Sequence, residues 1–211
     1  MSDEFETDTM WECDWTQKET FKQNVLALKQ KYTFISLKEA YNHISCDKLR
    51  WANYAVLTSD DGWASSKDIL PWLVEVEIPV TLFLNPMYFD GIHKQSRETE
   101  KLLTMVEVED LVRSCSPYVT IASHGWSHKD CLKMTDAEFA ADVDRAEQSL
   151  SNIDGKIPFY AFTFGRHRKN QLAVLHEKHL IPVLMDGNKN YSYARCIHRE
   201  LLDGKLCCDI I

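Results

Sequence analysis

The sequence predicts an α/β protein built as one domain around parallel strands. Its 211 residues are 45% hydrophobic, with only 7 Gly and 6 Pro, which suits one ordered domain with a sizeable core. From about Tyr54 onward, short runs of β-branched and aromatic residues alternate with segments that begin with helix caps. Connections of this length favour parallel strands in a sheet or a barrel.

The amino-terminal part predicts two helices. We expect them at residues 17–31 and 37–44, joined by residues 32–35, which could form one more short strand. Residues 1–15 are expected to be a flexible or peripheral segment of the single domain that spans residues 1–211.

Four helix starts share one pattern, a Ser or Thr followed three residues later by Glu. In such a pair the two side chains accept hydrogen bonds from backbone N–H groups that the first turn would otherwise leave unsatisfied. The pairs are Thr16 with Glu19, Ser36 with Glu39, Thr104 with Glu107, and Thr135 with Glu138.

Five runs that are rich in β-branched and aromatic residues predict buried strands. They are residues 54–58, 80–84, 118–122, 157–164 and 181–185.

Composition excludes several classes of protein. The net charge of −8 argues against nucleic acid as the main partner, because phosphate binding needs concentrated Lys and Arg. No segment approaches the apolar length of a membrane span. Seven cysteines without a Cys-x-x-Cys pair indicate reduced thiols rather than disulfides. The acidic start lacks a secretory signal, so we expect a cytoplasmic protein, although a trimmed export signal would leave the same sequence.

Two motifs carry the chemistry. Residues 58–62 (Thr-Ser-Asp-Asp-Gly) follow one predicted strand, and His124 and His128, four positions apart, follow another. Because the carboxyl ends of parallel strands meet at one rim, we expect these side chains to lie close together. Each motif alone is weak, since Asp-Asp-Gly is also a turn sequence and a lone histidine is often only a satisfied polar residue. Their joint placement carries the prediction.

Charge suggests how the residues divide the work. Two histidines and one carboxylate leave a divalent ion with net positive charge and an open position for water. The neighbouring Asp60 and Asp61 cannot easily both bind one ion, so one is free to act as general base. Hydrolysis of a glycosidic bond is a rival use of paired carboxylates, but it does not need the histidines. The donor set suits Zn²⁺, with Co²⁺, Ni²⁺ or Fe²⁺ as alternatives.

These motifs resemble those of the polysaccharide deacetylases, the family-4 carbohydrate esterases that share the nodulation-factor deacetylase homology domain. That family carries Thr-Phe-Asp-Asp-Gly and His-[Ser/Thr]-x-x-His, where this chain has Thr-Ser-Asp-Asp-Gly at 58–62 and His-Gly-Trp-Ser-His at 124–128. The resemblance extends over roughly residues 21–199, with residues 159–165 in the place of the third motif.

The resemblance implies a distorted (β/α) barrel and metal-dependent removal of acetyl groups from an N- or O-acetylated carbohydrate. The substrate would be an oligo- or polysaccharide, or a sugar precursor. Asp60 would be the general base, and Asp61, His124 and His128 would bind one divalent ion.

The resemblance implies two more roles. The backbone N–H of Phe164, in the place of the family's Tyr, would stabilise the oxyanion of the tetrahedral intermediate. His198 would be the general acid that protonates the leaving amine, although a strand residue without a catalytic role is an equal alternative. Asp186 is a weak candidate for the fourth motif.

The chain departs from the family at three positions. Ser59 replaces the usual Phe, Thr163 replaces a Pro, and Ala161 stands where the family has an Arg that orients the base. Arg166 or Arg199 could take over that task.

Four residues are candidate substrate contacts. Trp63 and Trp126 flank the motifs and could stack on a sugar ring, although large aromatic side chains are more often core. Arg166 and Arg199 complete this set.

Two functions remain open. The first is a metal-dependent carbohydrate deacetylase, favoured because a protein that only binds has little reason to keep four costly polar groups together. The second is a carbohydrate-binding or assembly protein that keeps the fold after losing efficient catalysis, favoured by Ser59, Ala161 and Thr163.

Overall fold

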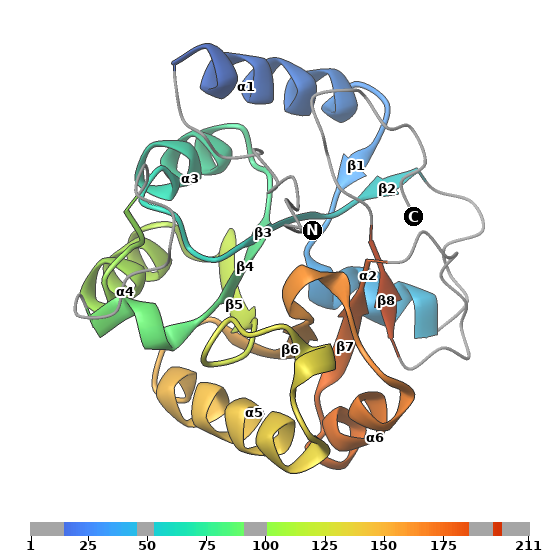
Figure 1. Ribbon diagram of the computed structural model, residues 1–211. Coiled ribbons are helices and arrows are strands. Elements are labelled where there is room, and N and C mark those ends of the chain that lie inside the picture. Colours follow the sequence, from blue (N-terminus) through green and yellow to red (C-terminus); the bar gives the residue numbers. More distant parts are fainter. Residues whose placement is uncertain (1–14, 46–52, 91–100, 186–195, 200–211) are drawn as a thin grey trace, which may run out of the picture.

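The computed structural model describes residues 15–45, 53–90, 101–185 and 196–199, and it confirms the α/β architecture. Six parallel strands form one curled sheet in the order β3-β4-β5-β6-β7-β8, and β1 pairs with β2 in a second sheet (Figure 1). The strands are β1 (Thr33–Phe34), β2 (Tyr54–Ala55), β3 (Leu57–Asp60), β4 (Val80–Leu84), β5 (Val119–Ser123), β6 (Lys156–Ala161), β7 (Ile181–Leu184) and β8 (Ile197–His198).

Helices connect these strands, as the alternation in the sequence predicts. The α-helices are α1 (Trp15–Lys29), α2 (Leu37–Ser45), α3 (Ser66–Glu75), α4 (Met105–Ser114), α5 (Asp136–Leu150) and α6 (Lys169–Glu177). Short 3₁₀ helices are η2 (Pro86–Asp90), η3 (Cys131–Lys133) and η4 (Thr163–Gly165). Of the predicted segment 1–15, only Trp15 lies within the described residues.

Three of the four predicted helix caps are confirmed. In each confirmed pair the Glu carboxylate accepts a backbone N–H of the Ser or Thr, and the hydroxyl accepts the N–H of the Glu. The pairs are Ser36 with Glu39, Thr104 with Glu107, and Thr135 with Glu138. The fourth prediction is wrong, because α1 already begins at Trp15, one residue before the expected cap Thr16.

Two strand predictions need correction. The run 54–58 splits into β2 and β3, so Asp60 is the last residue of a strand and pairs in register with Phe83. The run 157–164 ends its strand at Ala161, and Phe164 has a left-handed backbone with φ of 58°. A strand requires negative φ, so the chain must turn before this residue.

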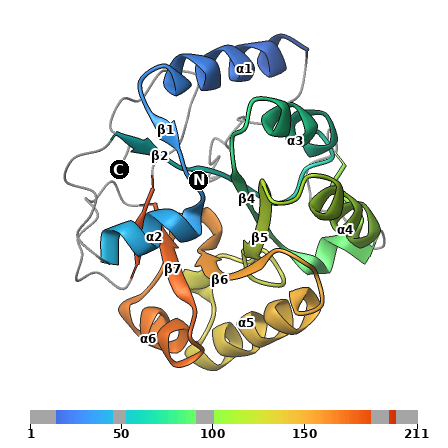
Figure 2. The ribbon, with the colours of Figure 1, turned by 180° about the vertical axis from the view of Figure 1, so that it is seen from behind.

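The two faces of the curled sheet pack against different helices. Outward residues such as Leu82 and Tyr160 belong to clusters formed with α3 to α6, which surround the sheet in Figure 1. Inward residues such as Phe83 and Ile197 pack with one another and with α2. Figure 2 shows α2 in front of β6 and β7. Because side chains alternate along a strand, this division assigns every strand residue to one face.

The sheet is an incomplete barrel. β3 and β8 are its two edge strands, and no ladder joins them within the described residues. The three cysteines in the described segments, Cys115, Cys131 and Cys196, are free thiols. In the described segments, no helix combines the length and the hydropathy that crossing a membrane would require.

We expect Phe139→Ala to destabilise the fold by about 3–5 kcal/mol, because removing a buried aromatic ring leaves a cavity. Phe139 is fully buried on α5, with its ring centroid 5.7 Å from that of Tyr160 and 5.8 Å from that of Phe162. Urea denaturation measures the loss. Val106→Ala is the control, since Val106 is 66% exposed and should change stability by no more than about 0.5 kcal/mol. Similar losses in both variants would contradict this core.

Candidate metal and catalytic site

The two predicted motifs meet at the carboxyl ends of the strands. Asp60 ends β3 and Asp61 follows it, while His124 directly follows β5. Two of the site residues have an unusual backbone conformation. Asp61 has φ of 70° and His128 has φ of 52°, a left-handed conformation that few residues other than glycine adopt. Both turns redirect the chain at the rim and aim the side chains inward.

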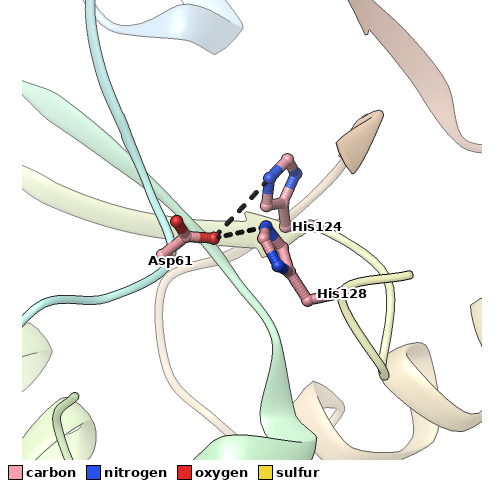
Figure 3. Close-up of side chains that lie close together, drawn as sticks. All are labelled: Asp61, His124 and His128. Atoms are coloured by element: carbon pink, nitrogen blue, oxygen red, sulfur yellow. Dashed lines mark ion pairs between the residues drawn. The ribbon is translucent and has the colours of Figure 1, made fainter. Parts of the chain in front are cut away.

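Asp61, His124 and His128 form a group that could hold a metal ion. Their potential ligand atoms all lie within 4.8 Å of one another. Oδ1 of Asp61 is 3.1 Å from Nε2 of His128 and 3.8 Å from Nε2 of His124, and Figure 3 shows the three side chains converging. Ligands bound at zinc–ligand distances in a tetrahedron are about 3.4 Å apart, so the group has the right size.

The chemistry of these atoms fits a divalent ion. Oδ1 of Asp61 is buried and has no hydrogen-bond partner within the described part of the chain. Nδ1 of His124 lies 2.8 Å from the carbonyl oxygen of Ala161, so it must carry the proton, and Nε2 keeps its lone pair. Burial lowers the pKa of His124, against the opposing effect of the two aspartates, which favours the neutral ring that a metal needs.

Asp60 lies beside this group and is held by Arg199. The two terminal nitrogens of Arg199 donate to the two carboxylate oxygens of Asp60, one of them at 2.8 Å. The same guanidinium donates to the hydroxyl of Thr58 at 2.8 Å and lies 5.1 Å from the ring centroid of Phe83. Burial by itself raises the pKa of Asp60. The charges of Arg199 and then His124 lower it, and their combined effect is larger than that of burial, so the pKa lies below the ordinary value.

Arg199 therefore makes a contact with Asp60 that Ala161, which stands where the family has an Arg, cannot make. Of the two arginines suggested for that task, Arg166 pairs with Asp130 at 3.3 Å, and only Arg199 reaches Asp60. The guanidinium of Arg199 bonds to Asp60 and Thr58, and the role of Arg199 in substrate binding stays a prediction. The contact was hard to predict because 139 residues separate the partners in sequence.

The two tryptophans differ in how far they are exposed. Trp63 is only 6% exposed and belongs to the core, where its backbone forms an isolated bridge with Leu102. Its predicted stacking role is therefore wrong. Trp126 is half-buried, and the guanidinium of Arg145 lies 3.6 Å from its ring centroid. A stacking role for Trp126 stays a prediction.

Phe164 lies next to the metal group. Its ring is 57% exposed, and its centroid is 5.0 Å from that of His128. The left-handed backbone of Phe164 turns the chain at the rim directly beside a candidate ligand. The predicted use of its N–H stays a prediction.

His198 faces away from Asp60. In the register of the sheet it pairs with Leu184, which belongs to the outer cluster, and Ile197 before it belongs to the inner one. Nε2 of His198 lies 3.5 Å from Sγ of Cys196, which packs on the same outer side. This geometry argues against the predicted role of His198 as general acid. Asp186 lies outside the described residues.

Sequence analysis missed two residues that hold the backbone between the histidines. Nδ2 of Asn85 donates to the carbonyl oxygen of His124 at 2.5 Å, and Asp142 accepts the N–H of Trp126 at 2.8 Å. The position of Asn85 directly after a predicted strand is a signal that could have revealed it. Asp142 lies in the middle of α5, where nothing local distinguishes it from the other acidic residues of that helix.

Comparisons with known proteins agree with this fold. Residues 50–181 match the family model described as polysaccharide deacetylase. IcaB from Ammonifex degensii has a similar structure, with a TM-score of 0.76 and 19% identity over 88% of this chain and 84% of that one.

Two further solved structures are similar. The deacetylase PplD of Streptococcus pyogenes, in complex with acetate, has a TM-score of 0.71 and 16% identity over 86% of this chain and 79% of that one. The BpsB deacetylase domain from Bordetella bronchiseptica has a TM-score of 0.66 and 17% identity over 95% and 87%. At these identities the likeness concerns the fold. A search of curated proteins found no match.

We expect Arg199→Met to remove a pH-dependent part of stability, because it deletes the cation that lowers the pKa of Asp60. The folded-state pKa of Asp60 lies below its ordinary value of 3.8, so the ion pair stabilises the fold fully above that pH and less as the pH falls through the folded-state pKa. The difference in free energy of unfolding between wild type and Arg199→Met should therefore be largest near neutral pH and shrink under acid conditions.

Urea denaturation of both proteins, with chelator present, measures this difference across the pH range. Arg113→Met is the control, since Arg113 pairs with Asp110 on the exposed side of α4. A difference that is constant with pH would mean that Arg199 stabilises the fold by packing alone.

Proposed function

Because this chain belongs to the polysaccharide deacetylase family, we propose that it hydrolyses acetyl groups from an acetylated carbohydrate, using one divalent metal ion. The observation that carries the proposal is the convergence of Asp61, His124 and His128 beside Asp60, whose two oxygens are held by Arg199. Zinc is the first choice for this donor set, with cobalt, nickel or iron as alternatives.

The residues divide the work as follows. A divalent ion bound by Asp61, His124 and His128 would polarise the acetyl carbonyl and acidify the attacking water. Asp60 accepts a proton from that water, because its carboxylate lies beside the ligands without duplicating them. Oδ2 of Asp60 is 3.7 Å from Nε2 of His124, which places the base within one water molecule of the metal group.

Arg199 orients the base. A bidentate pair fixes the plane of the Asp60 carboxylate, whereas a single hydrogen bond would leave it free to rotate. The positive charge also keeps Asp60 ionised and ready to accept a proton. The backbone N–H of Phe164, next to His128, is our candidate for stabilising the oxyanion.

The leaving group also needs a proton. Since His198 lies on the outer face of the sheet, we assign this step to Asp60, which has just gained a proton from water and can return it to the leaving oxygen or nitrogen. One carboxyl group then serves first as base and afterwards as acid.

One of the three features that favour a protein that only binds carbohydrate is offset. Ala161 lacks the family's guanidinium, but Arg199 supplies one to the same carboxylate. The substrate we propose is an acetylated oligo- or polysaccharide, or a sugar precursor, with the acetyl group on nitrogen or oxygen.

The direct test is release of acetate from a panel of acetylated oligosaccharides by metal-free and metal-reconstituted protein. We expect no turnover after chelation and recovery on adding Zn²⁺ or Co²⁺. Equal turnover with and without metal would contradict the proposal, and so would the absence of release from every substrate by protein shown to contain one metal per chain.

We expect Asp60→Asn to keep one metal per chain and to lose at least about a hundredfold in kcat, because an amide cannot accept the proton of water. Elemental analysis measures the metal and acetate release measures kcat. Asp110→Asn is the matched control, an exposed aspartate on α4 that should leave both unchanged. Loss of metal together with activity would make Asp60 a ligand instead.

We expect His198→Ala to lower hydrolysis of an N-acetylated substrate by no more than about threefold, since general acid catalysis by this residue would be worth a hundredfold or more. The comparison substrate is an activated aryl acetate, whose leaving group needs little protonation. A selective hundredfold loss on the amide substrate would restore His198 as the general acid and remove that role from Asp60.

A further inference from the structure

The backbone between His124 and His128 accepts hydrogen bonds at its carbonyl groups. All the donors come from one neighbouring segment, residues 85–88, which begins directly after β4 and continues into η2. Nδ2 of Asn85 donates to the carbonyl oxygens of His124 and Gly125, at 2.5 and 3.2 Å. The N–H of Met87 donates to the carbonyl of Trp126 at 3.1 Å, and the hydroxyl of Tyr88 to that of Ser127 at 3.1 Å.

Two amide groups of the same segment point the other way, toward α5. The N–H groups of Trp126 and Ser127 donate to the two carboxylate oxygens of Asp142, at 2.8 and 3.2 Å. Asp142 bonds the segment through a carboxylate, whereas Asn85, Met87 and Tyr88 bond it through an amide, a backbone N–H and a hydroxyl. Two consecutive N–H groups aimed at one carboxylate fix the plane of the peptide between them, because each oxygen accepts one of the bonds.

The segment is also matched to Asp142 by shape. Gly125 has φ of 79°, and a Cβ at this position would lie 2.9 Å from Oδ2 of Asp142 and 3.0 Å from Oη of Tyr160. His128 at the end of the segment has φ of 52°, a conformation that persists only when its surroundings impose it. The absence of a Cβ at Gly125 therefore leaves room for the carboxylate of Asp142. The bonds to that carboxylate help to hold the segment that ends in the left-handed conformation of His128.

We propose that Asp142 is a positioning residue of the metal site, which sets the distance and orientation between His124 and His128 from α5. The inference rests on the proposed metal role of these histidines. Removing a group that orients the ligands of a metal site typically weakens metal affinity tenfold to a hundredfold. Asp142 acts on both ligands through the backbone that joins them, whereas the bond from His124 to Ala161 orients one ring only.

Packing of α5 does not depend on this carboxylate. The helix is held by the buried side chains Phe139, Val143, Ala146 and Leu150, and its amino terminus by the pair of Thr135 and Glu138. Replacing Asp142 by Asn should therefore leave the helix in place. It would substitute an NH₂ group for one acceptor, and that group would face a backbone N–H as donor against donor.

The test is titration of metal-free protein with Co²⁺, followed by visible absorption and by competition with a chelator. We expect Asp142→Asn to bind Co²⁺ tenfold to a hundredfold more weakly than wild type, with an altered absorption spectrum, at a temperature where both metal-free proteins are folded by circular dichroism. Asp142→Glu keeps the charge and both acceptor oxygens, so it should recover part of the affinity.

Asp144→Asn is the matched control. Asp144 lies on the same helix, pairs with Lys178 and has a side chain that is 64% exposed, so its substitution makes the same change of charge without touching the segment. We expect wild-type affinity and spectrum for this variant. If Asp142→Asn does not fold, Asp142→Ser, which can accept only one of the two bonds, takes its place with the same expectation.

The outcomes separate this inference from the proposed function. Wild type and a folded Asp142 variant that bind Co²⁺ equally, with the same spectrum, would overturn the role of Asp142 and leave the metal site intact. A wild-type protein that shows no cobalt spectrum would overturn the metal site and this inference with it.

Discussion

The ion pair between Arg199 and Asp60 is the interaction on which the site depends. It joins the two edges of an open sheet, since Asp60 ends β3 and Arg199 directly follows β8, and no backbone ladder connects these strands within the described residues. The guanidinium also contacts Thr58 and the ring of Phe83, so it is held from the inner face of the barrel. The orientation of the proposed base and the connection between the two edges of the sheet thus rest on the same contact.

Residues with a strained, left-handed backbone lie around the same site, at the carboxyl ends of the strands. Of the five non-glycine residues with positive φ in the described segments, three are Asp61, His128 and Phe164, which contribute two candidate ligands and the candidate oxyanion donor. Each such residue costs of order 1–3 kcal/mol and persists only where the surrounding structure holds it. Asn85 and Tyr88, which donate to backbone carbonyls of the segment before His128, and Asp142, which accepts a backbone N–H there, supply that support.

The position of Arg199 shows how a required charge can move to another strand. Six parallel strands curl so that the guanidinium of Arg199, directly after β8 at one edge of the sheet, reaches the carboxylate of Asp60 at the end of β3, the other edge. Ala161, at the end of β6, has no side chain that could reach Asp60, and its carbonyl oxygen accepts the hydrogen bond from His124. A cation thus lies beside the proposed base although the family's usual Arg is absent.

The sequence by itself determined the class of fold and the four central polar residues. Alternating periodicity predicts the strands, capping pairs predict three helix starts, and Asp60, Asp61, His124 and His128 follow from two motifs at strand ends, because all these signals are local. Only the tertiary structure decided which arginine meets Asp60, that Trp63 is buried, that His198 faces outward, and that Asp142 holds the segment between the ligands. Those facts depend on the curl of the sheet and on which face a residue joins, and a shift of one residue along a strand reverses that face.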